Sequence, residues 1–447
     1  MTGDSPSAPD PITVLRSRQF LVLLVLAGIV GVVASLAAWC FLELINEAQD
    51  GVYSDLPDAL GFDSRPLWWP LPVLAIAGLI VAFAIARLPG RGGHVPAKGL
   101  NPSPTAPIEL PGVIVAAVAG ISLGAVVGPE APLIALGGGL GFLAIRMIRR
   151  DAPLQVQSLV AACGTFAAVS FLFGSPLIAA VLLIEATGLG GSRRTLILIP
   201  GLFASGIGTL VSLGLGSWTG VDTAEISLTY PQLPDFPRPD VVDFLWTVPL
   251  AAAIAIGTVV IFRVARVTER VASPRPFLAV PLIGIAVAGL AIAFAETTDK
   301  GVEQVLFSGE EALTPLVNHA DSWSLSALAL LIAFKGVAYA LSLGSFRGGP
   351  TFPAMFLGAA AGLMAAQLPG FDLTPAVAVG LGAGVVAVLR LPLSAVVLAT
   401  LLTAQSGFGV GPLIIVGVVV AYLVADFIDP DSDPIAKESE SAPAPAA

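Results

Sequence analysis

Two short Gly-Pro motifs inside apolar sequence carry the residue types best suited to chemistry. Residues 128–132 read Gly-Pro-Glu-Ala-Pro, and residues 349–353 read Gly-Pro-Thr-Phe-Pro. The last proline of each motif suits the first turn of a helix, because its missing N–H would have no partner there. Each motif therefore predicts a helix start with unpaired N–H groups and about half a positive charge. Two such starts brought together predict an anion site.

Glu130, in the first motif, has a specific predicted role. A carboxylate at membrane depth is costly, and it is best tolerated where it occupies the anion site itself. It would then compete with a permeant ion, and its protonation would release the site. We predict that Glu130 is a gate and a candidate proton carrier. The structural alternative is a carboxylate that only stabilises a helix N-terminus.

Two further sites have less specific patterns. Residues 90–96 (Gly-Arg-Gly-Gly-His-Val-Pro) form either an anion-lining loop, with His94 beside it, or a cytoplasmic connector. Glu185 lies in the apolar run 176–190 and either lines an aqueous path for protons or caps a helix end. The pattern leaves both pairs of alternatives open.

The chain contains an internal repeat. A shift of 221 places residues 128–141 on 349–362 with six identities in 14 positions, and a shift of 216 places 176–187 on 392–403 with six in 12. Two windows in the same order predict a duplication. The Gly-x-x-x-Gly spacing in both copies of the first window predicts close helix packing.

The composition sets the fold class. The chain is 56% hydrophobic and has 21 Lys+Arg and 31 Asp+Glu among 447 residues, which excludes a water-soluble globule. Continuous apolar runs exclude a membrane β-barrel, and 48 Gly with 37 Pro predict broken helices. We expect an all-α polytopic membrane protein with an inverted-topology repeat and broken, re-entrant helices.

Charged loops predict the orientation. Loops with clusters of Arg and Lys are expected in the cytoplasm, and acidic loops are expected outside. This assignment is consistent only if segments 112–145 and 154–190 each enter the membrane and return to the side from which they started. This pattern predicts a cytoplasmic N-terminus; we further expect the chain to lie in a bacterial-type plasma (inner) membrane. The predicted segments are a cytoplasmic start (1–18), two membrane halves (19–216 and 244–428), an extracellular linker (217–243) and an acidic disordered tail (429–447).

Four motifs in order resemble those of the CLC family of chloride channels and chloride/proton exchangers. Residues 92–96 are similar to the family's Gly-Ser-Gly-Ile-Pro, and 128–132 to Gly-Lys/Arg-Glu-Gly-Pro. Residues 173–177 (Phe-Gly-Ser-Pro-Leu) are similar to Phe-Asn-Ala-Pro-Leu, and 348–353 to Gly-Gly-Ile-Phe-Ala-Pro. The resemblance covers about residues 20–427.

The resemblance implies a homodimer in which each subunit has its own anion pathway, with Glu130 as the gating glutamate. Backbone amides around the two motifs would coordinate the anion. The implied anion-binding residues are Gly93, His94, Glu130, Ala131, Thr351 and Phe352, and the candidate proton path is Glu130 with Glu185.

This chain departs from the family pattern at several of these positions. The family's central-site serine falls on Gly93, and the next glycine is His94. Pro350 replaces an isoleucine and removes one backbone donor. The helix that carries the family's central-site tyrosine is expected to be absent. The position of the exchangers' internal glutamate corresponds to Ala186, one residue after Glu185. The sequence therefore does not decide between a channel and an exchanger.

The expected function is transport of a small monovalent anion, chloride by default, with a fluoride- or nitrate-preferring variant as the alternative. An intramembrane enzyme using Glu130 as a base is disfavoured, because the sequence offers no paired catalytic acids, metal pair or Ser-His arrangement. We expect no cofactor, no metal and no nucleic-acid partner.

Overall fold

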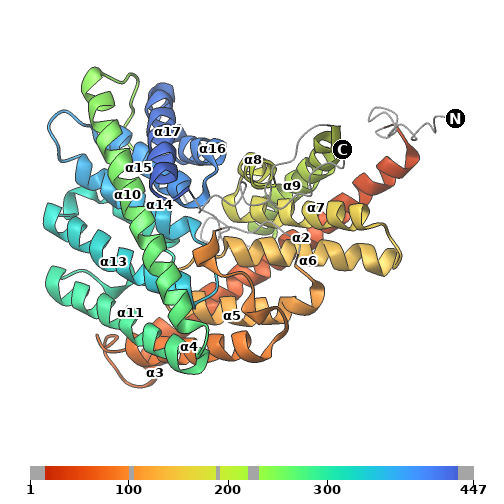
Figure 1. Ribbon diagram of the computed structural model, residues 1–447, viewed down its shortest axis with the longest axis horizontal. Coiled ribbons are helices and arrows are strands. Elements are labelled where there is room, and N and C mark those ends of the chain that lie inside the picture. The colour runs from red at the N-terminus through yellow and green to blue at the C-terminus, as the bar shows by residue number, and fades with distance from the viewer. Residues whose placement is uncertain (1–15, 100–104, 188–191, 220–230, 431–447) are drawn as a thin grey trace. The chain divides into compact units, whose positions relative to one another are not determined.

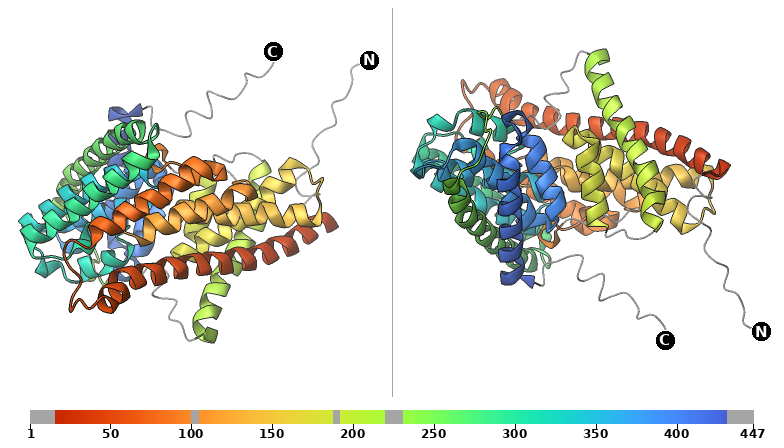
Figure 2. Two further views of the ribbon diagram at one scale, coloured as in Figure 1. Left: turned by 90° about the horizontal axis from the view of Figure 1, so that it is seen from below. Right: turned by 90° about the horizontal axis from the view of Figure 1, so that it is seen from above.

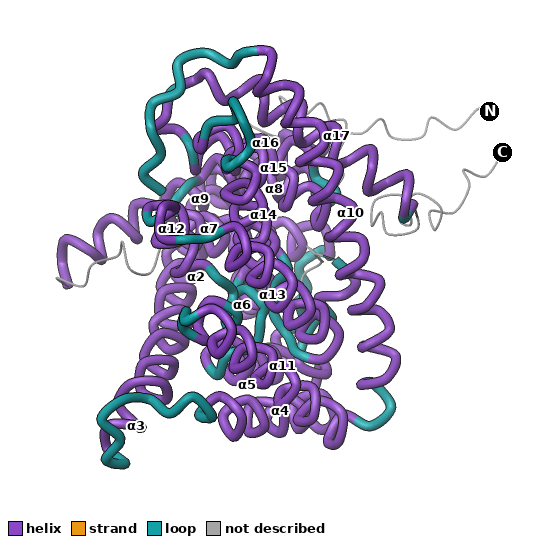
Figure 3. Tube along the Cα trace, turned by 90° about the vertical axis from the view of Figure 1, so that its left-hand side faces the viewer, coloured by secondary structure: helices purple, strands orange, loops and turns teal. Residues whose placement is uncertain are grey.

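The computed structural model describes residues 16–99, 105–187, 192–219 and 231–430, and its regular elements are helices (Figures 1 and 3). Nine helices in these ranges are long and apolar enough to cross a membrane, and five apolar helices are shorter. The predicted all-α membrane architecture with broken helices is confirmed.

Most of the helices are labelled in Figure 1, and a π-helical turn at Gly51–Asp55 connects α2 to α3. Their bounds are α2 (Arg18–Asp50), α3 (Leu56–Ala59), α4 (Pro70–Arg87), α5 (Leu110–Ser122), α6 (Glu130–Ile148), α7 (Leu154–Phe173), α8 (Pro176–Ala186), α9 (Ser192–Thr219), α10 (Val241–Ala272), α11 (Pro276–Thr298), α12 (Glu310–Asn318), α13 (Leu325–Ser345), α14 (Thr351–Ala365), α15 (Leu373–Leu389), α16 (Pro392–Leu402) and α17 (Gly411–Ile428).

The chain divides into two compact units. The first comprises Met1–Cys40, Pro102–Pro107 and Leu133–Ser227. The second comprises Phe41–Asn101, Ile108–Pro132 and Leu228–Ala447. The division into two membrane halves (19–216 and 244–428) and a linker (217–243), which the sequence repeat predicts, stays a prediction. Residues 1–15, 220–230 and 431–447, which make up most of the predicted start, linker centre and tail, lie outside the described residues.

In the first unit, α6 and α7 run side by side at very short separation (Figure 2). A Cβ on Gly137 would lie 2.4 Å from the Gly164 carbonyl oxygen, and one on Gly141 would lie 2.4 Å from that of Val160. Only glycine permits this approach. The predicted packing role of the Gly-x-x-x-Gly spacing is therefore confirmed.

The second unit repeats this arrangement with α14 and α15, whose interiors are almost wholly buried. A Cβ on Gly358 would lie 2.2 Å from the Gly380 carbonyl oxygen, and one on Gly362 would lie 2.5 Å from that of Ala376. The order α6–α7–α8 is thus matched by α14–α15–α16. The last helix of each series has 11 residues and begins at a proline, Pro176 or Pro392.

Gly358→Ala tests this packing. The added methyl group forces α14 and α15 apart, so we expect a loss of about 1–3 kcal/mol in stability and a lower thermal midpoint in detergent. Gly257→Ala in α10 is the matched control, because a Cβ there meets nothing within 4 Å and alanine favours the helix. An unchanged midpoint in Gly358→Ala would contradict the packing argument.

Candidate anion-binding site

The two Gly-Pro motifs lie against each other within the second unit. The Gly128 N–H donates to the Gly349 carbonyl at 2.7 Å, and the Gly349 N–H donates to the Gly128 carbonyl at 2.6 Å. The two segments run antiparallel at this bridge. Helix α6 begins two residues after Gly128, and α14 begins two residues after Gly349. The predicted meeting of two helix starts is therefore present.

Glu130 places its carboxylate at the start of α14. The side chain is 2% exposed, and its Oε1 accepts a hydrogen bond from the backbone N–H of Thr351, the first residue of that helix. Its Oε2 is buried with no hydrogen-bond partner. A carboxylate in this position takes the place that an anion would occupy at a helix N-terminus.

Glycine is required on both sides of this carboxylate. A Cβ on Gly128 would lie 2.2 Å from Oε2 of Glu130, and a Cβ on Gly349 would lie 1.9 Å from its carboxyl carbon. Any other residue would displace the carboxylate. The bridge between the motifs and the position of Glu130 thus depend on the same two residues.

Hydrogen bonds from neighbouring elements hold the segment that leads into the first motif. The Tyr53 hydroxyl donates to the Leu123 carbonyl at 3.0 Å, and the Val126 N–H donates to the Ser342 hydroxyl at 3.1 Å. The Phe307 N–H donates to the carbonyl of Gly124 at 3.3 Å. Irregular backbone at membrane depth is tolerated when protein groups satisfy it in this way.

The second motif is fixed by a tyrosine that no local sequence pattern identifies. Tyr339 of α13 is 1% exposed, and its hydroxyl donates to the Pro350 carbonyl at 2.5 Å. Pro350 has no N–H, so the first free donor of the motif is that of Thr351, which Glu130 uses. Phe352 is also buried, with its ring 3.1 Å from the position of a Cβ on Gly128.

The predicted loop residues Gly93 and His94 lie in a separate turn of the second unit. Gly93 has a φ of 96° and packs against Val113 of α5. His94 Nε2 lies 2.9 Å from the Gly99 carbonyl oxygen, which it satisfies by donating. Burial lowers the pKa of His94, and the nearby Lys98 and Arg347 charges lower it further, so the ring is neutral at pH 7.

The structure thus brings some predicted site residues together and leaves others apart. Glu130 and Thr351 are hydrogen-bonded, and Ala131 and Phe352 follow them directly in the two helices. Glu185 is half-buried near the end of α8, in the other unit. The roles assigned to these residues stay predictions.

The sequence-based prediction did not include Lys335, although a single cation within the apolar run 325–344 indicates a buried, hydrogen-bonded group. Lys335 is completely buried in α13. Its ammonium group donates to the carbonyls of four consecutive residues, 304–307, at 3.0–3.3 Å. It also lies 4.5 Å from the centre of the Phe356 ring of α14. Lys335 therefore ties the segment before α12 to α13 and α14.

Glu310, the first residue of α12, is a second carboxyl group that interacts electrostatically with Glu130. The preceding Gly309 has a φ of 84° and leaves room for the Phe356 ring, which would lie 2.8 Å from a Cβ there. Burial raises the pKa of Glu310 well above its ordinary value, and the charges of Glu130 and Glu311 raise it further. These surroundings favour the protonated form of Glu310.

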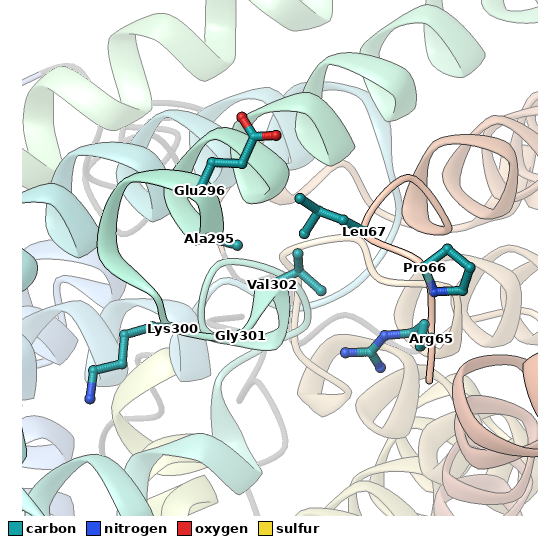
Figure 4. Close-up of a pocket in the computed structure, with 8 residues that line it drawn as sticks. All are labelled: Arg65, Pro66, Leu67, Ala295, Glu296, Lys300, Gly301 and Val302. Atoms are coloured by element: carbon teal, nitrogen blue, oxygen red, sulfur yellow. The ribbon is translucent and has the colours of Figure 1, made fainter. Parts of the chain in front are cut away.

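A hollow of about 310 Å³ lies elsewhere in the second unit, between Arg65, Leu67, Glu296, Lys300 and Val302 (Figure 4). Its Arg65 side chain pairs with Glu303 at 3.1 Å. The hollow shares no residue with the two motifs.

Comparison with known proteins decides the family. Residues 98–426 match the sequence profile of the voltage gated chloride channel family. The chain belongs to the voltage-gated chloride channel (CLC) family. As a member of this family it is a multi-pass membrane protein for anion transport, and the resemblance of its motifs is confirmed.

Relatives and solved structures agree with this assignment. "Putative ion-transport protein YfeO" of Salmonella schwarzengrund is 30% identical over 361 residues, covering 78% of this chain and 81% of that protein. A slow cyanobacterial Cl⁻/H⁺ antiporter has a similar fold, with a TM-score of 0.74, 20% identity and coverage of 94% and 98%. A CLC-type fluoride/proton antiporter has a TM-score of 0.66, 16% identity and coverage of 91% and 95%.

Lys335→Met tests the structural role of the buried ammonium. Each carbonyl left without its donor costs about 1–3 kcal/mol, so we expect a much lower thermal midpoint. Lys300→Met is the control, because the Lys300 ammonium donates to one carbonyl at 3.0 Å and lies over a single ring at the protein surface. An equal fall of the thermal midpoint in the two variants would show that the four-carbonyl contact stabilises the protein no more than the surface contact of Lys300.

Glu310→Gln tests the protonation of Glu310. Because the folded-state pKa lies above the ordinary 4.5, the unfolded chain ionises first and the wild type loses stability as pH rises from 4.5 toward the folded-state value. The amide removes this loss, so the thermal midpoint of Glu310→Gln should fall less than that of the wild type between about pH 5 and about pH 8. Glu296→Gln, on an exposed side chain, should follow the wild type. Parallel profiles for Glu310→Gln and wild type would overturn the assignment.

Proposed function

We propose that this CLC-family protein moves a small monovalent anion, chloride by default, along a pathway gated by Glu130. The observation that carries the proposal is the carboxylate of Glu130 at the start of α14, hydrogen-bonded to the Thr351 N–H. The Glu130 carboxylate carries one negative charge and accepts hydrogen bonds, as a small anion does, and it already lies at the start of α14.

The gate follows from competition for one donor. While Glu130 is ionised and bonded to Thr351, an anion cannot use that N–H. Protonation removes the charge that holds the carboxylate there, and a permeant anion then replaces it. Because Oε2 has no hydrogen-bond partner, the carboxyl group has an oxygen free to accept the proton without breaking another bond.

The other predicted residues complete the proposal. Backbone amides at Ala131 and Phe352, together with Gly93 and His94, line the pathway, and Glu185 continues the proton path from Glu130. The working unit is a homodimer in the bacterial inner membrane with a cytoplasmic N-terminus. Coupled proton movement distinguishes an exchanger from a channel.

A fluoride- or nitrate-preferring transporter is the second candidate. The observation in its favour is Gly93, which supplies no hydroxyl group where the family has a serine, so the pathway has fewer side-chain donors for chloride. Selectivity among the three anions decides between the candidates.

Anion flux from liposomes, with internal pH followed at the same time, tests the gate. Wild-type protein should move chloride, and its rate should depend on pH. Glu130→Gln keeps the shape but cannot ionise, so it should leave an anion leak that no longer depends on pH and carries no protons.

Glu296→Gln is the control for this experiment, because Glu296 is an exposed carboxylate in the same unit, and it should behave like the wild type. Unchanged pH dependence in Glu130→Gln would refute the gating role. Fluoride flux without chloride flux would favour the second candidate, and flux of no anion would overturn the proposal.

A further inference from the structure

Glu310 is a carboxyl group beside the gate that the proposed function does not use. It is the first residue of α12 and is half-buried, whereas Glu130 is 2% exposed. The two carboxyl groups interact electrostatically. Oε2 of Glu130 is buried with no hydrogen-bond partner, so this oxygen takes up a proton without breaking a hydrogen bond. A half-buried acid beside such an oxygen is suited to exchange protons with it.

Contacts on two sides fix the start of α12 relative to the gate. The Phe307 N–H donates to the Gly124 carbonyl at 3.3 Å, in the segment that leads into the first motif. Gly309 lies against the ring of Phe356 in α14, whose Cγ would be 2.8 Å from a Cβ at Gly309. Glu310 is therefore held near both of the helices that start at the gate, α6 and α14.

The charged and titratable groups of the neighbouring elements leave Glu310 without a paired cation. The ion pairs in the described part of the chain, none of which includes Glu310, are Arg65–Glu303, Lys98–Glu269 and Arg266–Asp429. Helix α14, on which α12 packs, contains no titratable residue. In α13, the Lys335 ammonium is held by the carbonyls of residues 304–307. Tyr339, which faces Glu130, donates its hydroxyl to the Pro350 carbonyl. An unpaired, partly buried carboxyl group favours its protonated form, which has an O–H to donate.

Two further carboxylates connect Glu310 to the protein surface. Glu311 is exposed and acts on Glu310 electrostatically. It accepts a hydrogen bond from Nε2 of Gln49 at 3.4 Å, and the exposed Asp50 at the end of α2 acts on it in turn. The loops that carry these residues are acidic, so this surface is expected outside the membrane. Its negative charge raises the local concentration of protons at Glu310.

We propose that Glu310 is a proton-transfer residue that carries protons between this acidic surface and Oε2 of Glu130. The inference rests on the proposed function, because it assigns the route by which the gate is protonated. The O–H bond of Glu310 breaks as an O–H bond forms at Glu130, and the Glu310 carboxylate then takes a proton from water at the surface. The two carboxyl groups share no hydrogen bond within the described residues, so a water molecule passes the proton between them.

Anion flux from liposomes tests the transfer when it is measured over a series of pH values that are equal on both sides. Glu310→Gln keeps the size of the side chain but cannot carry a proton, so Glu130 must be protonated directly from water. We expect the flux at about pH 7 to fall about tenfold and its pH profile to move about one unit toward lower pH. Glu296→Gln, on an exposed side chain, is the matched control and should follow the wild type.

The same change in a Glu130→Gln background tests whether Glu310 acts through the gate. Because the amide at position 130 cannot take up a proton, adding Glu310→Gln there should change the flux by less than about twofold. A purely structural role for Glu310 would lower the flux by the same factor in both backgrounds.

The outcomes separate this inference from the gate. A pH profile of Glu310→Gln that matches that of Glu296→Gln overturns the transfer role and leaves the gate intact, and so does an equal loss of flux in both backgrounds. A wild type that moves no anion overturns the proposed function and the transfer role together. If Glu310→Gln fails to fold, Glu310→Asp decides, because its carboxyl group is one methylene farther from the gate. Its flux should stay pH-dependent but fall about threefold at about pH 7, and a flux equal to that of the wild type overturns the role.

Discussion

The hydrogen bond from the Thr351 N–H to the Glu130 carboxylate is the interaction on which the account of this protein depends. It joins the first residue of one helix to the first residue of another across the repeat. The Gly128–Gly349 bridge, the missing side chains at both glycines and the Tyr339 contact to Pro350 all serve to place it. A carboxylate can remain at this depth because a helix start supplies the donor and partial charge that water would otherwise provide.

Much of this site could be predicted from the sequence, because its signals are local. A Gly-Pro motif that opens an apolar run marks a helix start, and two matching motifs at a fixed shift mark a repeat, which the structure shows as α6–α7–α8 and α14–α15–α16. The spacing of Gly358 and Gly362 likewise predicted a close helix contact, because that pattern directly encodes one face of a helix.

Other parts depend on contacts between distant residues and have no local signal. Nothing near Glu310 indicates that it acts on Glu130, and nothing near Tyr339 indicates that it reaches Pro350. Lys335 is visible as a cation in apolar sequence, but only the fold shows that four carbonyls satisfy its ammonium group.

We propose that the Glu130 carboxylate and the permeant anion occupy the same position at the start of α14. Crystals of Glu130→Ala grown in bromide test it most directly, because bromide is located by its anomalous scattering. We expect a bromide ion within hydrogen-bond distance of the Thr351 N–H, at the position that the Glu130 carboxylate occupies in the wild type. An empty helix start in a variant that still transports anions would contradict it.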